Sequence, residues 1–316
     1  MPLVKESMSC NSCILQGSIG INQSCDVKPS DHYQALYAMK TFPSLDIVKN
    51  AIRRKKSSNV LTIGIMGTSF RDFVSNWMPQ IDFSFVLVIN GCDLDFPTHY
   101  FENEKKFCQF IEHVNIKHVF AQNCIITHPK ITRLPIGLDY HTLANGATSW
   151  GPCQTPCEQE RVLMKLQKQA NPFWERKPLC YSNFHFFFGP SHGNDRRDAL
   201  LKLNKEIVFY EPCSKPRLDS WRTQTEYAFV LSPHGNGLDC HRTWEALNLG
   251  CIAIVKRSQI DQLYDDLPVL IVNCWSEIDV TLLKNTIDTF RNKTFNYRKL
   301  ELQYWKDKIR SFCSEK

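Results

Sequence analysis

The sequence predicts an α/β protein with two domains, each built around a sheet of parallel strands. Short apolar runs such as 60–66, 83–90 and 227–231 recur along the chain, and parallel strands buried on both faces have such continuous runs. Helix-like patterns, for example 158–169 and 195–203, lie between them. A chain of 316 residues that is 43% hydrophobic can bury two moderate cores. Because strands and helices alternate in both halves, we expect two domains and not one.

The first domain is predicted to begin with a polar, irregular segment of about fifty residues, which holds one short helix candidate, 44–53. The turn Gly67-Thr-Ser69 comes directly after the first strand. The elements expected in this domain are, in order, strand 60–66, helix 71–78, and strands 83–90, 118–122 and 131–137, and helix 158–169 follows them at the start of the next domain.

The second domain repeats this alternation without repeating the sequence. Two glycines and two prolines in 145–158 predict a linker or lid before it, although an ordinary surface loop has the same composition. We therefore expect domains at 1–157 and 158–290, and a final helical segment at 291–316. The elements expected are strand 179–184, helix 195–203, strands 207–210, 227–231 and 269–272, and helices 280–291 and 297–312.

The most informative segment is 227–255, because it joins a strand, a glycine turn, a helix and another strand. Gly235 and Gly237 allow a tight turn, Asp239 is in position to cap a helix, and Gly250 is expected to end that helix. Backbone N–H groups at such a turn favour phosphate, and Arg242 adds a fixed fork of donors. The segment therefore predicts an anion site.

Two further features of this helix bear on the prediction. Glu245 is placed to accept hydrogen bonds from sugar hydroxyls, but it lies three residues from Arg242, so the two side chains could instead pair with each other. Trp244, Leu247 and Cys251 are expected on the buried side.

The same segment resembles the signature of the exostosin-like glycosyltransferases. In that signature a strand ending near Ser-Pro leads through Gly-x-Gly-x-Asp to Arg, Trp-Glu-Ala-Leu and Gly-Cys-Ile, and all of these are present in this chain between Ser232 and Ile252. The resemblance is strong over 229–255 and looser back to Pro178. Ala253 stands where proline is usual.

The resemblance implies the GT-B architecture, in which two Rossmann-like α/β domains face a cleft and the C-terminal helix crosses back to the first domain. It implies an inverting, metal-independent glycosyltransferase that moves a sugar, such as xylose or galactose, from a UDP-sugar to a hydroxyl of an oligosaccharide or glycoprotein glycan. UDP-sugar would be a co-substrate, and no cofactor is expected. Some members of the family are compact proteins encoded by large DNA viruses, and this chain is similar to them because its sequence contains no membrane anchor.

We expect the donor to be held by polar and basic residues of the second domain. Arg196 and Arg197 open a helix, where the helix dipole disfavours cations, so a bound anion would explain them. Tyr210 is a candidate to stack on the base, or a core aromatic; His234 is a candidate ligand, or a structural histidine. The full expected set is Ser182, Asn183, Arg196, Arg197, Tyr210, Ser232, His234, Gly235, Asn236, Gly237, Asp239, Arg242, Thr243 and Glu245.

An inverting reaction needs a base that faces the donor from the first domain. Asp72 ranks first because it follows the Gly67-Thr-Ser69 turn, and Asp93 and Asp95 follow the second strand. His141 is a further candidate. Asp93-Leu-Asp95 would alternatively hold Mg or Mn in a metal-dependent glycosyltransferase.

Two other function classes stay open. A non-catalytic glycan-binding or scaffold protein would keep the fold without needing the arginine, the glutamate and the glycine turn together. A sugar-phosphate phosphorylase would use the same anion site, and its product formation would depend on added orthophosphate.

Composition limits the partners and the compartment. The net charge of +6 is mild and no basic block is present, so a nucleic-acid partner is not expected. No apolar segment is long enough to span a membrane, and residues 1–30 lack the core of a signal peptide. We expect a cytoplasmic protein, in the host cytoplasm if it is viral, or one in the secretory lumen if the sequence is part of a longer chain.

The 14 cysteines are interpreted mainly as small buried hydrophobes, because most lie in apolar runs. Two groups, Cys10 and Cys13 with Cys25, and Cys153 with Cys157, have spacings that a metal could use, but no second pair completes a zinc pattern. The cysteines expected to be buried are Cys92, Cys108, Cys124, Cys180, Cys251 and Cys274.

Overall fold

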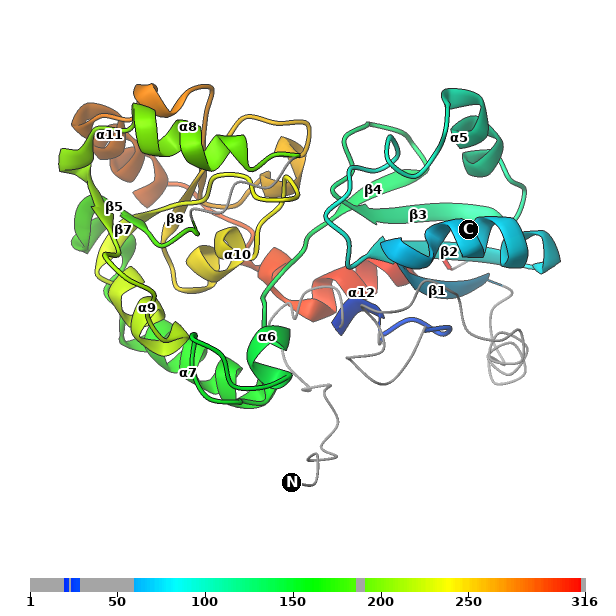
Figure 1. Ribbon diagram of the computed structural model, residues 1–316, viewed down its shortest axis with the longest axis horizontal. Helices are drawn as coiled ribbons and strands as arrows, with labels where there is room; N and C mark the ends of the chain where they lie inside the picture. The colour runs from blue at the N-terminus through cyan, green and yellow to red at the C-terminus, as the bar shows by residue number, and fades with distance from the viewer. Residues whose placement is uncertain (1–19, 23, 29–59, 186–190, 314–316) are drawn as a thin grey trace.

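The computed structural model describes residues 20–22, 24–28, 60–185 and 191–313, and the helix candidate 44–53 lies outside these ranges. The described chain is α/β and contains two parallel sheets, as predicted (Figure 1). The first sheet has the order β1-β2-β3-β4 and consists of β1 (Val60–Met66), β2 (Ser84–Asn90), β3 (Ile116–Gln122) and β4 (Ile131–Leu134). The second has the order β6-β5-β7-β8-β9 and consists of β5 (Lys177–Ser182), β6 (Val208–Tyr210), β7 (Tyr227–Leu231), β8 (Ile252–Lys256) and β9 (Val269–Val272).

The helical elements of residues 67–169 follow the strands of the first sheet along the chain, and the last of them, α7 (Pro156–Gln169), contacts α9 (Arg217–Gln224) and α10 (His241–Asn248) of the second half. The helix expected at 71–78 is irregular, because it is divided into an α-helical turn, a π-helical turn and a 3-10 turn. Two α-helices were not predicted: α5, which has the charged residues Glu104, Lys105 and Lys106 in its first turn, and the four-residue α6. The helical elements are η1 (Gly67–Ser69), α4 (Phe70–Asp72), η2 (Phe73–Trp77), η3 (Met78–Gln80), α5 (Glu104–Ile111), α6 (His141–Ala144) and α7 (Pro156–Gln169).

The second half contains the helices expected from the sequence and one that was not, α9. The helix expected at 297–312 is broken at Glu301 into a 3-10 turn and α12. The helical elements are η4 (Phe173–Glu175), α8 (Asn194–Lys202), η5 (Lys205–Ile207), α9 (Arg217–Gln224), α10 (His241–Asn248), η6 (Asp261–Tyr264), η7 (Trp275–Glu277), α11 (Val280–Arg291), η8 (Tyr297–Leu300) and α12 (Leu302–Arg310).

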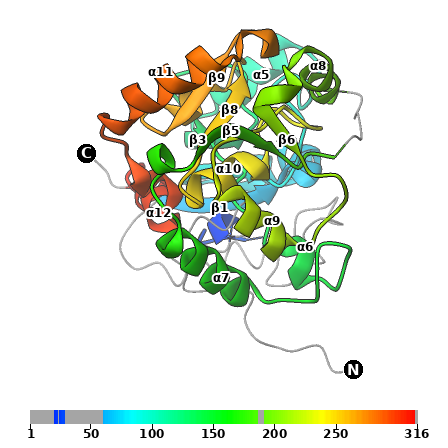
Figure 2. The ribbon, with the colours of Figure 1, turned by 90° about the vertical axis from the view of Figure 1, so that its left-hand side faces the viewer.

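Alternation along the strands divides each sheet between two cores. In β7, Phe229 and Leu231 pack toward α11, whereas Val230 packs with Trp244 of α10 on the opposite face. Figure 2 shows α7 and α9 side by side below the second sheet, where they are in contact. The core that contains Val230 continues into the first half, where it includes Phe120 of β3.

The end of the chain packs against the first sheet. Phe312, which follows α12, stacks on His118 of β3 with ring centroids 3.7 Å apart. Burial lowers the pKa of His118 to about 4, so the ring is neutral in this apolar contact. No helix among the described residues is long and apolar enough to cross a membrane.

The prediction for the cysteines is only partly correct. Cys124, Cys180 and Cys251 are buried, but Cys92, Cys108 and Cys274 are partly exposed. Cys92 and Cys274 each follow the end of a strand by two residues, where the chain leaves the core. Of the candidate metal pair, Cys153 is a free exposed thiol and Cys157 is disulfide-bonded, so the two do not present a pair of thiolates to a metal.

The glycine turn of the second half is joined to the first half by buried hydrogen bonds. The backbone N–H of Asp239 donates to the Asn123 side chain at 3.0 Å, and the N–H of Ile136 donates to the Asp239 carboxylate at 2.7 Å. His241 donates from Nδ1 to the carbonyl of Gly137 at 2.7 Å. These contacts fix the turn against the loops that leave β3 and β4.

Because of this contact between the turn and the first half, we expect the stability of the protein to be sensitive to a side chain at position 237. A Cβ there would lie 2.6 Å from Nδ2 of Asn123 and 3.0 Å from the backbone oxygen of Asp93. We expect Gly237→Ala to lower the free energy of unfolding by about 1–3 kcal/mol, measured by urea denaturation. Gly146→Ala is the matched control, because no atom lies within 4 Å of its added Cβ. Equal stability of the two variants would contradict the close contact.

Candidate functional site

A cavity of about 1180 Å³ lies where the carboxyl ends of the two sheets face each other. Its walls are the loops after β2 and β3, the segment around Asp139, and the loops after β5, β6 and β7. Ligand sites of parallel α/β sheets form at these strand ends. The cavity is lined by ten of the predicted donor residues: Ser182, Asn183, Arg196, Tyr210, Gly235, Asn236, Gly237, Asp239, Arg242 and Glu245.

Two arginines face this cavity from different helices. Arg242 is on α10, and its Nη1 is buried without a hydrogen-bond partner among the described residues. Burial, together with the nearby charge of Arg196, lowers the pKa of Arg242 to about 10. Its guanidinium lies 5.7 Å from the ring centre of Phe184, which supplies no countercharge. The cation is therefore held in a site that disfavours it unless an anion is present.

The Arg196 side chain reaches the cavity by lying against Gly235. Its Nη1 donates to the carbonyl of His185 at 3.3 Å, and a Cβ at Gly235 would lie 2.6 Å from its Nη2. Gly235 therefore leaves the space that the guanidinium occupies. Arg197, the next residue on α8, is exposed and does not line the cavity. The two arginines that the sequence could not distinguish thus have different surroundings.

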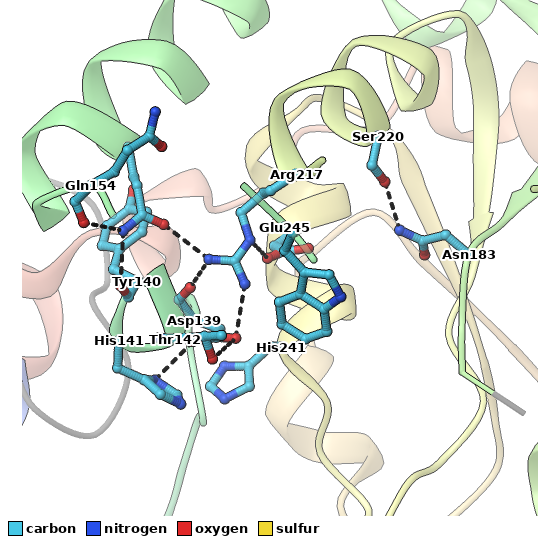
Figure 3. Close-up of polar contacts among 12 residues, drawn as sticks. Asp139, Tyr140, His141, Thr142, Gln154, Asn183, Arg217, Ser220, His241 and Glu245 are labelled. Atoms are coloured by element: carbon cyan, nitrogen blue, oxygen red, sulfur yellow. Dashed lines mark hydrogen bonds and ion pairs between the residues drawn. The ribbon is translucent and has the colours of Figure 1, made fainter. Parts of the chain in front are cut away.

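The cavity floor contains further polar atoms without partners. Asn183 donates from Nδ2 to Ser220 at 2.8 Å, while its Oδ1 is buried and accepts no hydrogen bond from a described residue (Figure 3). The Tyr210 hydroxyl is likewise buried without a described partner. Buried polar atoms in proteins are nearly always hydrogen-bonded, so these atoms favour a polar ligand or water.

Arg217 forms the most connected charged cluster of the cavity wall (Figure 3). Its Nη2 lies 2.9 Å from the Asp139 carboxylate, its Nη1 donates to the Asp139 carbonyl and to Gln159, and its Nε lies 3.9 Å from Glu245. The guanidinium also packs over Trp150, 5.1 Å from the ring centre. This pairing settles the sequence alternative: Glu245 faces Arg217, and Arg242 forms no ion pair with a described residue.

The carboxylates of this cluster differ in their electrostatics. Burial alone would raise the pKa of Asp139, but its hydrogen bond with His141 and the charges of His141, His241 and Arg217 hold it well below its usual range. Burial raises the pKa of Glu245, and Arg217 opposes that shift. Asp139 is therefore the fixed anion of the cluster.

Asp239 has a different role from the predicted helix cap. Cys240 is the N-cap of α10, and it makes no side-chain capping bond. The Asp239 carboxylate accepts from the N–H of Ile136 at 2.7 Å, from Trp244 Nε1 at 2.9 Å and from the Tyr264 hydroxyl at 3.1 Å. The capping prediction was wrong because the side chains of Trp244 and Tyr264 and the backbone of Ile136 take both oxygens, and two of these three partners are 25 and 103 positions away. Gly250 does end α10, with φ of 75°.

Three other predicted donor residues lie outside the cavity lining. The hydroxyls of Ser232 and Thr243 are buried and lie 2.7 Å apart. The backbone N–H of His234 donates to Asp195, and its Nδ1 donates to the carbonyl of Leu238 at 2.8 Å. These residues hold the shape of the turn and are not brought to the cavity.

The three carboxylates proposed as bases are also separated. Asp72 accepts from the side chains of Asn76 and Trp77 and does not line the cavity. Asp95 is buried, and both of its oxygens lie 3.0 Å from His192 Nε2.

Asp93 does line the cavity, beside Asn236 and Arg196. Burial raises its pKa, and those two neighbours lower it. Within the described ranges, no group of three or more His, Cys, Asp and Glu side chains has the arrangement of a metal site.

Sequence reasoning did not find Asp139 and Arg217 as members of the cavity wall. Asp139 had one available signal, because it stands between the predicted strand 131–137 and the candidate His141. Arg217 had none, since the residues it binds lie 58 and 78 positions away.

A scan of the chain against protein-family models finds no match, and a search of curated proteins finds none either.

The buried cluster predicts a large loss of stability when Arg217 is removed. Arg217→Ala would leave Asp139 buried without its cation, and we expect the free energy of unfolding to fall by about 3–5 kcal/mol. Arg222→Ala on the same helix is the control: its pair with Asp219 is exposed, so a change of about 0–1 kcal/mol is expected. Chemical denaturation measures both, and a loss below 1 kcal/mol for Arg217→Ala would contradict this account.

Asp239 predicts a dependence of stability on pH. Burial raises its pKa from 3.8 to about 6, so the folded chain holds this proton more tightly than the unfolded chain. Stability from this group is then present below about pH 4 and lost as the pH rises through 6. Relative to Asp239→Asn, the parent should lose up to about 3 kcal/mol between these pH values in urea denaturation. A difference that does not vary with pH would contradict the raised pKa.

Proposed function

We propose that this protein is an inverting, metal-independent glycosyltransferase of the exostosin-like type, with its two α/β halves in the GT-B arrangement. Its donor would be a UDP-sugar, with xylose or galactose as the preferred sugars, and its acceptor a hydroxyl of an oligosaccharide or glycoprotein glycan. The observation that carries the proposal is the Arg242 guanidinium, which lines the cavity and whose Nη1 is buried without a described hydrogen-bond partner.

The chemistry of Arg242 supports a diphosphate ligand. A guanidinium presents a planar fork of donors that matches phosphate oxygens. Arg196 reaches the same cavity and adds a second positive charge. Two such cations can stabilise the charge that develops on a leaving diphosphate in the transition state, which is the task that a divalent metal performs in other enzymes.

The floor of the cavity supports a nucleoside next to the diphosphate. Asn183 Oδ1 is a buried acceptor, suited to a base N–H, and the Tyr210 hydroxyl can donate or accept. Tyr210 ends β6 and its ring packs against the core of the second sheet, and we propose that the part of the ring at the cavity stacks on the base. Asn183 Oδ1, the Tyr210 hydroxyl and Arg242 Nη1 therefore offer hydrogen bonds to a ligand that has both a polar base and an anionic group.

The size of the cavity supports two substrates. Sites for a single small molecule are about 300–1,000 Å³, and this cavity is about 1180 Å³. The donor contacts named above all come from the second half, which leaves the wall around Asp139 and His141 for an acceptor.

The test is thermal unfolding with UDP, GDP and a panel of nucleotide sugars, each with EDTA or with Mn²⁺. A nucleotide at about one hundred times its dissociation constant should stabilise the parent by roughly 2.7 kcal/mol, and we expect this for UDP with EDTA present. Arg242→Met keeps the side-chain volume and removes the charge, so it should lose about 1.5–3 kcal/mol of UDP binding without losing stability when no ligand is present.

Arg197→Met is the matched control, because Arg197 lies one residue from Arg196 and is outside the cavity. It should keep the full response to UDP, whereas Arg196→Met should reduce it. If no nucleotide stabilises the parent, the proposal is wrong and a glycan-binding or scaffold role becomes the leading one. A response that requires Mn²⁺ would reject the metal-independent mechanism.

A further inference from the structure

His141 and Asp139 form a contact that the donor site does not use. Nδ1 of His141 lies 3.0 Å from Oδ1 of Asp139 (Figure 3), and both residues line the cavity. The two side chains are 22% and 8% exposed. They belong to the segment that leaves the first sheet and enters α6, so they stand in the wall assigned above to the acceptor.

The surroundings of Asp139 fix the tautomer of His141. Asp139 accepts from the backbone N–H and the hydroxyl of Thr142 at 3.0 and 2.8 Å, and Arg217 holds its other side. An ionised carboxylate held in this way accepts the proton on Nδ1, so the lone pair of a neutral His141 is on Nε2. This is the geometry in which an oriented imidazole acts as a base.

The other candidates for a base are in less suitable places. Asp72 and Asp95 do not line the cavity. Asp93 does, but it stands beside Arg196 in the anion half, where it would repel the diphosphate.

We propose that His141 is the general base of the transfer reaction, with Asp139 as its positioning residue; this inference rests on the proposed function. His141 Nε2 takes the proton from the acceptor hydroxyl while the acceptor oxygen forms its bond to the anomeric carbon. The bond from that carbon to the diphosphate oxygen breaks, and its electron pair leaves with UDP. The proton on Nε2 then passes to water.

The charges around His141 set the direction of the pH effect. The groups that face it are Asp139 on its own segment, Arg217 from α9 and His241 from α10, whose ring centre is 5.4 Å away. Burial lowers the pKa of His241 to about 4, so that ring is neutral near neutral pH. A histidine base can take a proton only in its neutral form, so turnover should fall as the pH is lowered.

The experiment compares the parent with His141→Ala and His141→Gln. UDP release from UDP-galactose or UDP-xylose, with methyl glycosides or water as acceptors, gives kcat and KM across the pH range. We expect kcat to fall about 10²–10⁴-fold with little change in the KM for donor, the acid limb of the profile to disappear, and added imidazole to restore part of the activity of His141→Ala. His113→Ala, in the first half and outside the cavity, should behave as the parent.

Thermal stabilisation by UDP, measured on the same variants, separates the possible failures. Variants that still bind UDP are folded, and their loss of turnover then supports His141 as the base. If the parent transfers sugar and His141→Ala does so equally, with the same acid limb and no response to imidazole, this inference is overturned while the proposed function stands. If the parent neither binds nucleotide nor releases UDP, the proposed function is overturned and this inference with it.

Discussion

The buried contact between Arg217 and Asp139 is the interaction on which the arrangement of the cavity depends. Asp139 belongs to the segment that leaves the first sheet, and Arg217 begins α9 beneath the second. One guanidinium therefore connects the two halves and sets the place of Glu245 on α10. Because a buried charge without its partner is costly, this contact allows few alternative arrangements of the three elements. This contact therefore determines the shape of the cavity wall formed by Asp139, Arg217 and Glu245.

The side of the cavity that contains Arg242 and Arg196 differs, because its charges are not paired with carboxylates in the same way. Arg242 is partly buried near Arg196, and it forms no ion pair with a described residue, so folding leaves an unpaired charge in place. Proteins commonly accept such local instability at functional sites and offset it elsewhere. The cavity thus combines one cluster whose charges are paired, around Arg217, with a second charge that has no described ion-pair partner, Arg242, which we propose as the anion site.

The sequence predicted what local patterns determine. Continuous apolar runs identified the strands of both sheets, and the glycine at 250 identified the end of α10. Short patterns also placed Arg242 and Glu245 at a cavity, but they could not tell Arg196 from Arg197, because the distinction is which of two neighbours faces Gly235. The prediction that Asp239 caps α10 failed for a related reason, because the hydrogen-bond partners of its carboxylate come from three separate segments of the chain. Hydrogen bonds between distant segments leave no periodic trace in a sequence.

The joint around Gly237 has a consequence for how the cavity is used. The turn that contains Gly235 and Gly237 is hydrogen-bonded to the loops that leave the first sheet, and Asp239 contributes both its N–H and its carboxylate. The halves cannot swing apart without breaking these buried bonds. The relative placement of the two halves is therefore completed when the chain folds, so the walls of the cavity are in position before a ligand arrives and binding does not have to order them.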